Sequence, residues 1–180
     1  MNSRTIPAEW LPNYNYSDYS KWPGDWELIY GFPYAMSPSP KRPHQNFGRN
    51  FIILISEALQ AFKTECDCKV YYELDWIIND NTIIRPDAMI VCGKFEDDFL
   101  RFPPNLILEI TSEGTLLKDR NVKFKLYESH GVKYYILADP DRKSIESFVL
   151  KNNQYQEMNE DNFQLTGICT VQLDLQRLWL

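Results

Sequence analysis

The sequence lacks several features that would assign it to a functional class at once. Its net charge is −6 over 180 residues, so it has no overall basic surface of the kind that grips nucleic-acid phosphates. No wholly apolar run is longer than that of residues 51–55, which is too short to cross a membrane. The first residues lead to no apolar signal-peptide core. Any nucleic-acid contact must therefore be local, and we expect a cytoplasmic chain with no membrane partner.

Cysteine and histidine are also scarce. The four cysteines, Cys66, Cys68, Cys92 and Cys169, include no Cys-x-x-Cys pair, and the two histidines lie far from them in the sequence. This spacing argues against a zinc site. Nothing in the pattern indicates disulfides either, which favours a reducing compartment.

What is present indicates a single globular domain. Hydrophobic residues make up 44% of the chain and aromatic residues 14%, which argues against disorder. Residues 1–25 read as an N-terminal extension. The patterns after it predict a hairpin at 26–36, helices at 44–62 and 119–130, and strands at 70–72, 75–78, 82–85, 88–92, 106–111, 132–138, 143–150 and 168–173. We expect a domain of the α/β class, with a mixed sheet flanked by helices.

Two acidic residues stand in or beside apolar strand patterns. Asp87 precedes residues 88–92, and Glu109 follows 22 positions later within Leu-Ile-Leu-Glu-Ile. Burying a carboxylate costs free energy unless it is paired or bound to a metal. On neighbouring strands the two acids could share one Mg²⁺ or Mn²⁺ ion. The alternative is that both pair with surface lysines at strand ends, and spacing alone does not decide.

The second predicted helix adds a lysine. Asp119, Lys123 and Tyr127 are four residues apart, which places them on one stripe of an α-helix. Lys123 could then point along the sheet toward the two acids and stabilise charge on a phosphoryl oxygen. The alternative is a surface pair between Asp119 and Lys123, with Tyr127 as a packing residue.

Taken together, these motifs resemble one bacterial family, the putative restriction endonucleases of the Uma-two type, a branch of the PD-(D/E)XK nuclease superfamily. The resemblance runs from about Trp26 to Leu150. It rests on Arg85-Pro86-Asp87, Leu108-Glu109-Ile110-Thr111-Ser112, Thr115-x3-Asp119-x3-Lys123-x3-Tyr127 and Gly131 to Asp139. The resemblance implies a restriction endonuclease-like fold.

The resemblance also implies site residues. Asp87 and Glu109 match the acidic metal ligands, and the carbonyl of Ile110 matches a third ligand. Glu27 and His44 match an acidic position in the first hairpin and a histidine that opens the first long helix. Read without the family, Glu27 would be a solvated hairpin acid and His44 a partly buried packing residue.

One position departs from the superfamily pattern. Thr111 occupies the place two residues after the acid where a catalytic lysine is expected, and the resemblance implies that Lys123 supplies it instead. The predicted function is a metal-dependent endonuclease that uses Mg²⁺, with Mn²⁺ able to substitute, and cleaves nucleic acid, with DNA as the expected substrate. Two alternatives stay open: a nuclease fold that binds DNA or protein without cutting, and a hydrolase of small phosphoesters. A homodimer is also left open.

Overall fold

The computed structural model describes residues 7, 10–36, 39–60 and 66–179. Helices and strands follow one another along these residues in an order that begins with a short helix and a hairpin. They are α1 (Tyr16–Tyr19), β1 (Trp26–Ile29), β2 (Phe32–Ala35), α2 (Arg42–Gln60), β3 (Cys68–Tyr72), β4 (Trp76–Asn79), β5 (Thr82–Ile84), β6 (Ala88–Cys92), β7 (Leu106–Ile110), η2 (Lys118–Lys123), α3 (Phe124–Ser129), β8 (Tyr134–Asp139), β9 (Ser144–Lys151), β10 (Gln154–Met158), β11 (Asn162–Gln164), β12 (Thr170–Gln172) and η3 (Leu175–Trp179).

The centre of the molecule is a six-stranded sheet with the order β10-β9-β8-β7-β6-β3. Its β7 and β8 run parallel, while the other neighbours in the sheet are antiparallel. The sheet is therefore mixed, as the sequence predicts. Strand β7 is buried along its whole length, which explains why it reads as a nearly continuous apolar run.

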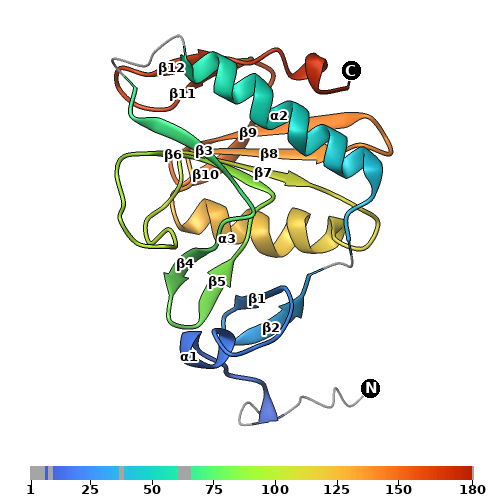
Figure 1. Cartoon of the computed structure of the whole chain (residues 1–180), viewed down its shortest axis with the longest axis vertical. Coiled ribbons are helices and arrows are strands. Elements are labelled where there is room, and N and C mark those ends of the chain that lie inside the picture. The colour runs from blue at the N-terminus through green and yellow to red at the C-terminus, as the bar shows by residue number, and fades with distance from the viewer. Residues whose placement is uncertain (1–6, 8–9, 37–38, 61–65, 180) are drawn as a thin grey trace.

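Helices cover both faces of this sheet (Figure 1). Helix α2 packs on one face, together with residues of β11, β12 and η3, against Leu106, Leu108 and Ile110 of β7. Helix α3 packs on the other face, where Ile107 lies with Leu126 and other apolar residues. Because side chains alternate along a strand, this arrangement places Glu109 on the α3 side, as predicted.

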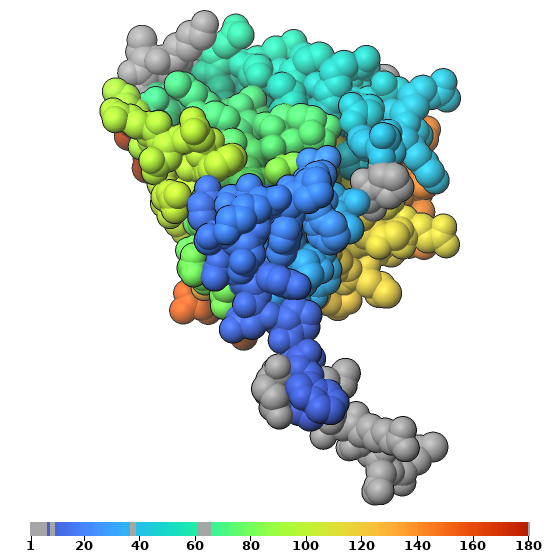
Figure 2. Space-filling view, turned by 60° about the horizontal axis from the view of Figure 1, so that its bottom comes forward, coloured from blue at the N-terminus to red at the C-terminus, as the bar shows by residue number. Residues whose placement is uncertain are grey.

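A second, four-stranded sheet with the order β2-β1-β5-β4 holds the N-terminal hairpin. Leu28 of β1 pairs with Ile83 of β5, and both are buried in a small core that also includes Ile77. The hairpin turns at Gly31, whose φ of +80° favours glycine. In Figure 2 the blue segment that contains β1 and β2 lies beside the yellow segment that leads into α3.

The second long helix differs from the prediction in its geometry. Lys118–Lys123 form a π-helix, and α3 continues from Phe124 to Ser129. A π-helix bonds residue i to residue i+5, so residues five apart lie on successive turns of one face. The predicted α-helical stripe of Asp119, Lys123 and Tyr127 therefore does not include Lys118. The π-helix places Lys118 on the same face as Lys123.

The observed bounds of the other helices and strands can be compared with the predicted ones. The first hairpin and the strands at β3 to β9 are present near their predicted bounds, while β10 and β11 were not predicted. Strand β10 is mostly exposed, so its alternating pattern carries little hydrophobic signal. The predicted helix at 44–62 is α2, which begins two residues earlier, and residues 61–62 lie outside the described residues. Part of the N-terminal extension is described, and it contains α1.

The expectation that the chain has no disulfides is wrong in this structure. Cys66 is bonded to Cys169 and Cys68 to Cys92. The two pairs are separated by 103 and 24 positions in the sequence, so only the fold brings them together. Among the described residues no helix combines the length and apolar character that crossing a membrane requires.

Candidate active site

Asp87 stands at the entrance to β6, where its carboxylate contacts two other predicted site residues. Its Oδ2 accepts a hydrogen bond from the backbone N–H of Ile110 at 2.6 Å. Its Oδ1 lies 3.3 Å from Nε2 of His44, near the start of α2. Burial works to lower the pKa of His44, but the hydrogen bond and charge of Asp87 outweigh it and raise that pKa. His44 therefore positions Asp87 against the end of β7.

Glu109 is buried on the α3 side of β7, with its side chain 4% exposed. Its Oε1 accepts hydrogen bonds from the ammonium of Lys123 at 2.8 Å and from the hydroxyl of Tyr127 at 2.5 Å. Burial raises the pKa of Glu109 to about 8 even though Lys123 acts in the opposite direction. The surface-lysine alternative is therefore wrong for Glu109, whose partner Lys123 is also buried.

Glu27 comes from β1 and is fully buried. Its Oε1 lies 2.8 Å from Nζ of Lys123, and its Oε2 lies 2.6 Å from Nζ of Lys118. The backbone N–H of Arg85 also donates to Oε1 at 3.1 Å. Burial works to raise the pKa of Glu27, but the charges of Lys123 and Lys118 outweigh it and lower that pKa. The reading of Glu27 as a solvated hairpin acid is wrong.

The π-helical segment explains how two lysines reach one carboxylate. Lys118 and Lys123 are five residues apart, and both contact Glu27, as the i to i+5 geometry of η2 allows. Asp119 on the same segment is buried, with its Oδ1 3.9 Å from Nζ of Lys123. Burial raises the pKa of Asp119 despite the charge of Lys123. The surface-pair alternative for Asp119 and Lys123 is therefore wrong.

These side chains line a cavity of about 640 Å³ that opens beside the main sheet. Its lining includes the predicted residues His44, Asp87, Glu109, Ile110 and Lys123. Glu27 lies behind it, in contact with the two lysines. The fold thus brings all six predicted site residues into one region, although they come from β1, α2, the start of β6, β7 and η2.

The balance of charge around the cavity is negative. Four carboxylates, those of Glu27, Asp87, Glu109 and Asp119, face the two ammonium groups of Lys118 and Lys123. Arg85 also lines the cavity, but its guanidinium is paired with Asp75 and Asp25.

The donor set suits a hard cation, because it consists of carboxylate oxygens with a main-chain carbonyl beside them. The contacts of Glu109 with Lys123 and Tyr127 use Oε1, which leaves Oε2 for a ligand. Within the described ranges, groups of three or more His, Cys, Asp or Glu ligand atoms within 4.8 Å of one another occur only at the cysteines. A metal at Asp87 and Glu109 would therefore need the Ile110 carbonyl and water to complete its shell.

Sequence reasoning missed the contact of Lys118 with Glu27. Only a π-helix, which no local pattern indicates, gives Lys118 this position. Two other basic residues, on η2 and α3, point elsewhere. Arg120 pairs with Glu146, and Lys125 is 73% exposed and pairs with Glu128. Thr111, in the expected lysine position, is buried and donates to the carbonyl of Ala138 at 3.1 Å.

Comparison with known proteins gives the family of this chain and supports its fold. A family model described as "Putative restriction endonuclease" (Uma2) matches residues 16–179. The crystal structure of a putative nuclease belonging to DUF820 from Anabaena variabilis ATCC 29413 is similar to this chain, with a TM-score of 0.70 and 16% sequence identity. The match covers 91% of this chain and 96% of that chain. At this identity the likeness shows the fold alone.

A second solved structure, the DrdV–DNA complex, shares 13% identity with this chain. That match covers 65% of this chain and 12% of the other, with a TM-score of 0.33, which is too low to carry an argument. A search of curated proteins finds no match.

Proposed function

This chain belongs to the Uma2 family, described as "Putative restriction endonuclease", and on that premise we propose that it is a metal-dependent endonuclease acting on phosphodiester bonds in DNA. The observation that carries the proposal is the contact of Lys123 with both Glu27 and Glu109 beside Asp87 and a cavity. Such a buried cluster of opposite charges at a cavity is typical of catalytic sites.

The residues present fit one Mg²⁺ ion, for which Mn²⁺ could substitute. Asp87, Glu109 and the Ile110 carbonyl would hold it, because all three lie at the cavity. When bound, such an ion polarises a phosphoryl oxygen and lowers the pKa of a coordinated water. The protein's own contribution is to hold these oxygens in place before the ion and substrate arrive.

The surrounding side chains have separable roles. The charge of Lys123 lowers the pKa of Glu27 and opposes the rise that burial causes in the pKa of Glu109. The charges of these two acids in turn hold the pKa of Lys123 well above its ordinary value despite burial. Its ammonium stays positive near the cavity, where it can stabilise negative charge on a phosphate oxygen. Tyr127 fixes Glu109 Oε1 from the other side. His44 does the same for Asp87.

Lys118 supplies a second ammonium at the cavity. It is 18% exposed and reaches Glu27, so it is more accessible to a substrate than the buried Lys123. Lys41 from the segment before α2 lines the same cavity. These cations could receive a nucleic-acid backbone locally although the chain as a whole is acidic. We place this activity in the cytoplasm, and a homodimer remains a prediction.

The test is cleavage of supercoiled plasmid DNA by purified protein in Mg²⁺ or Mn²⁺. The wild type is expected to nick or linearise the plasmid, and Asp87→Asn and Glu109→Gln are expected to abolish this. Asp141→Asn is a matched control, because Asp141 lines the same cavity and is exposed; it should cleave like the wild type. A wild type that binds the plasmid without cutting it, with either metal, would favour the non-cutting alternative.

A further inference from the structure

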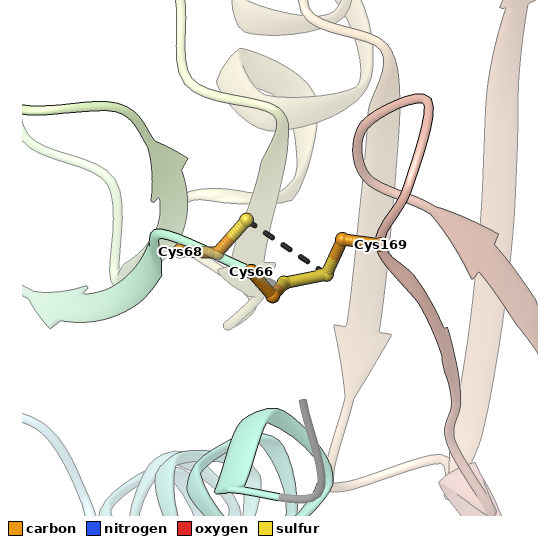
Figure 3. A group of neighbouring side chains, drawn as sticks. All are labelled: Cys66, Cys68 and Cys169. Atoms are coloured by element: carbon orange, nitrogen blue, oxygen red, sulfur yellow. Dashed lines mark hydrogen bonds between the residues drawn. A yellow bond between two sulfur atoms is a disulfide. The ribbon is translucent and has the colours of Figure 1, made fainter. Parts of the chain in front are cut away.

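The four cysteines of this chain lie together at one end of the main sheet, away from the acidic site. Cys68 is the first residue of β3, and its register partner on β6 is Cys92. Cys66 precedes the strand by two residues, and Cys169 lies just before β12. Figure 3 shows Cys66 bonded to Cys169, with the sulfur of Cys68 directed toward that of Cys169.

The main chain would bring these sulfur atoms together without any bond between them. Directly opposite residues of an antiparallel pair project to the same face of a sheet, which accounts for Cys68 and Cys92. The N–H of Gly93, which follows β6, donates to the carbonyl of Asp67 at 2.8 Å. Asp67 lies between Cys66 and Cys68, so this bond holds the end of β6 beside both cysteines. The position of both strands is therefore set by hydrogen bonds.

Cys169 is held in the same way. Its N–H donates to Oγ1 of Thr166 at 3.1 Å, and its carbonyl accepts from the N–H of Leu165 at 2.8 Å. The residue is fully buried. These hydrogen bonds do not involve the sulfur atom, so the turn between β11 and β12 holds the Cys169 side chain near the start of β3 in either oxidation state.

In the structure the four sulfur atoms are paired in two disulfides, and they are grouped closely enough to share one metal ion once those bonds are reduced. The ligand atoms of Cys66, Cys68 and Cys169 all lie within 4.8 Å of one another, and Sγ of Cys68 is 4.0 Å from Sγ of Cys169. Sulfur atoms around a tetrahedral zinc ion, with Zn–S of about 2.3 Å, are about 3.8 Å apart. Cys92 is not in this group of three, but it is bonded to Cys68, and reduction of that bond would supply a fourth thiol. In the cytoplasm proposed above, which is reducing, grouped cysteines more often bind metal than form disulfides.

We propose that the reduced form of this cluster binds one Zn²⁺ ion through Cys66, Cys68, Cys92 and Cys169. Reduction of the two disulfides takes four electrons and four protons from thiol reductants, and zinc binding then releases the four thiol protons as the four Zn–S bonds form. The ion ties β3, β6 and the turn before β12 together. This site is structural and separate from the acidic cavity, and it replaces the sequence-based expectation of no zinc site.

The closing experiment uses full-length protein reduced with a phosphine, freed of metal and titrated with Zn²⁺ under nitrogen. Mass spectrometry under native conditions is expected to show one zinc per chain, and Co²⁺ in its place should give the thiolate charge-transfer and visible bands of a tetrahedral site. Cys169→Ser should lose the stoichiometric zinc. Val171→Ala, which removes buried volume from the same hairpin, should lower the melting temperature and keep the zinc.

Two outcomes would overturn the proposal. One is reduced wild-type protein that takes up no zinc and shows no Co²⁺ thiolate bands. The other is Cys169→Ser that retains zinc with wild-type affinity. The Glu109→Gln variant, tested in parallel, should still bind one zinc ion. The zinc proposal can therefore fail or hold independently of the proposed metal site at Glu109.

Discussion

The ammonium of Lys123 lies 2.8 Å from Oε1 of Glu109, and both side chains are almost completely buried. The same ammonium is 2.8 Å from Oε1 of Glu27, so one cation is shared by two acids from different sheets. An ion pair of this kind costs much to desolvate and is strongly destabilising to break from one side. Its presence beside a cavity is therefore easier to explain by function than by stability.

The first prediction concerns this shared cation. Lys123→Met should lower the free energy of unfolding by roughly 3–5 kcal/mol, because it leaves two buried carboxylates without their common partner. It should also abolish plasmid cleavage. Chemical denaturation monitored by tryptophan fluorescence measures the stability.

Lys125→Met is the matched control for that variant. Lys125 is two residues away but 73% exposed, so its replacement should change stability by less than about 0.5 kcal/mol and leave cleavage intact. If Lys123→Met and Lys125→Met were equally stable and equally active, the shared-cation account would be wrong.

The second prediction concerns Tyr127, whose hydroxyl donates to Glu109. Partners that orient a metal ligand typically change metal affinity by roughly 10- to 100-fold when removed, so Tyr127→Phe should weaken Mn²⁺ binding by about that factor. Tyr155→Phe is the control, because the Tyr155 hydroxyl donates to the Val132 carbonyl instead. Equal Mn²⁺ affinities in the two variants would remove Tyr127 from the site.

The third prediction concerns the pH dependence of stability. Oε1 of Glu128 accepts from the backbone N–H of Tyr155 at 2.7 Å, and Oε2 accepts from Lys125 at 2.9 Å. Both contacts lower the pKa of Glu128 below its ordinary value of 4.5, and the hydrogen bond from the Tyr155 backbone has the larger effect. Because the folded-state pKa is depressed, the stabilisation is present above pH 4.5 and is lost as the pH falls through the folded-state pKa.

Glu128→Gln should therefore be less stable than the wild type at pH 7, by roughly 1–2 kcal/mol. The difference should shrink as the pH is lowered below 4.5. Urea denaturation at several pH values measures it, with Glu157→Gln, an exposed glutamate on β10, as control. A difference between wild type and Glu128→Gln that grew on acidification would have the wrong sign.

The residues that the sequence predicts well are those with strong local signals. Glu109 stands out because a charge interrupts an apolar strand, and strand alternation assigns it to the face shared with Ile107. The family resemblance adds Glu27 and His44, which no local rule distinguishes from a solvated acid and a packing histidine. Their contacts, Glu27 with Lys123 and His44 with Asp87, form only because the fold brings β1 and α2 to the end of β7.

Other features depend on tertiary structure and could not be read from the sequence. The contact of Lys118 with Glu27 requires a π-helix, and the apolar periodicity of this segment fits an α-helix as well. The cysteine cluster requires the β11–β12 turn to return to the start of β3, across 103 positions. Contacts at such separations leave no spacing motif for the sequence to show.

The central claim is that Asp87 and Glu109 hold one divalent cation, and calorimetric titration of the protein with Mn²⁺ tests it most directly. Wild-type protein should bind at one saturable site, and Glu109→Gln should lose that binding. Glu113→Gln, an exposed neighbour that lines the same cavity, should bind like the wild type. A wild type that takes up no Mn²⁺, or a Glu109→Gln variant that binds it with unchanged affinity, would contradict the account.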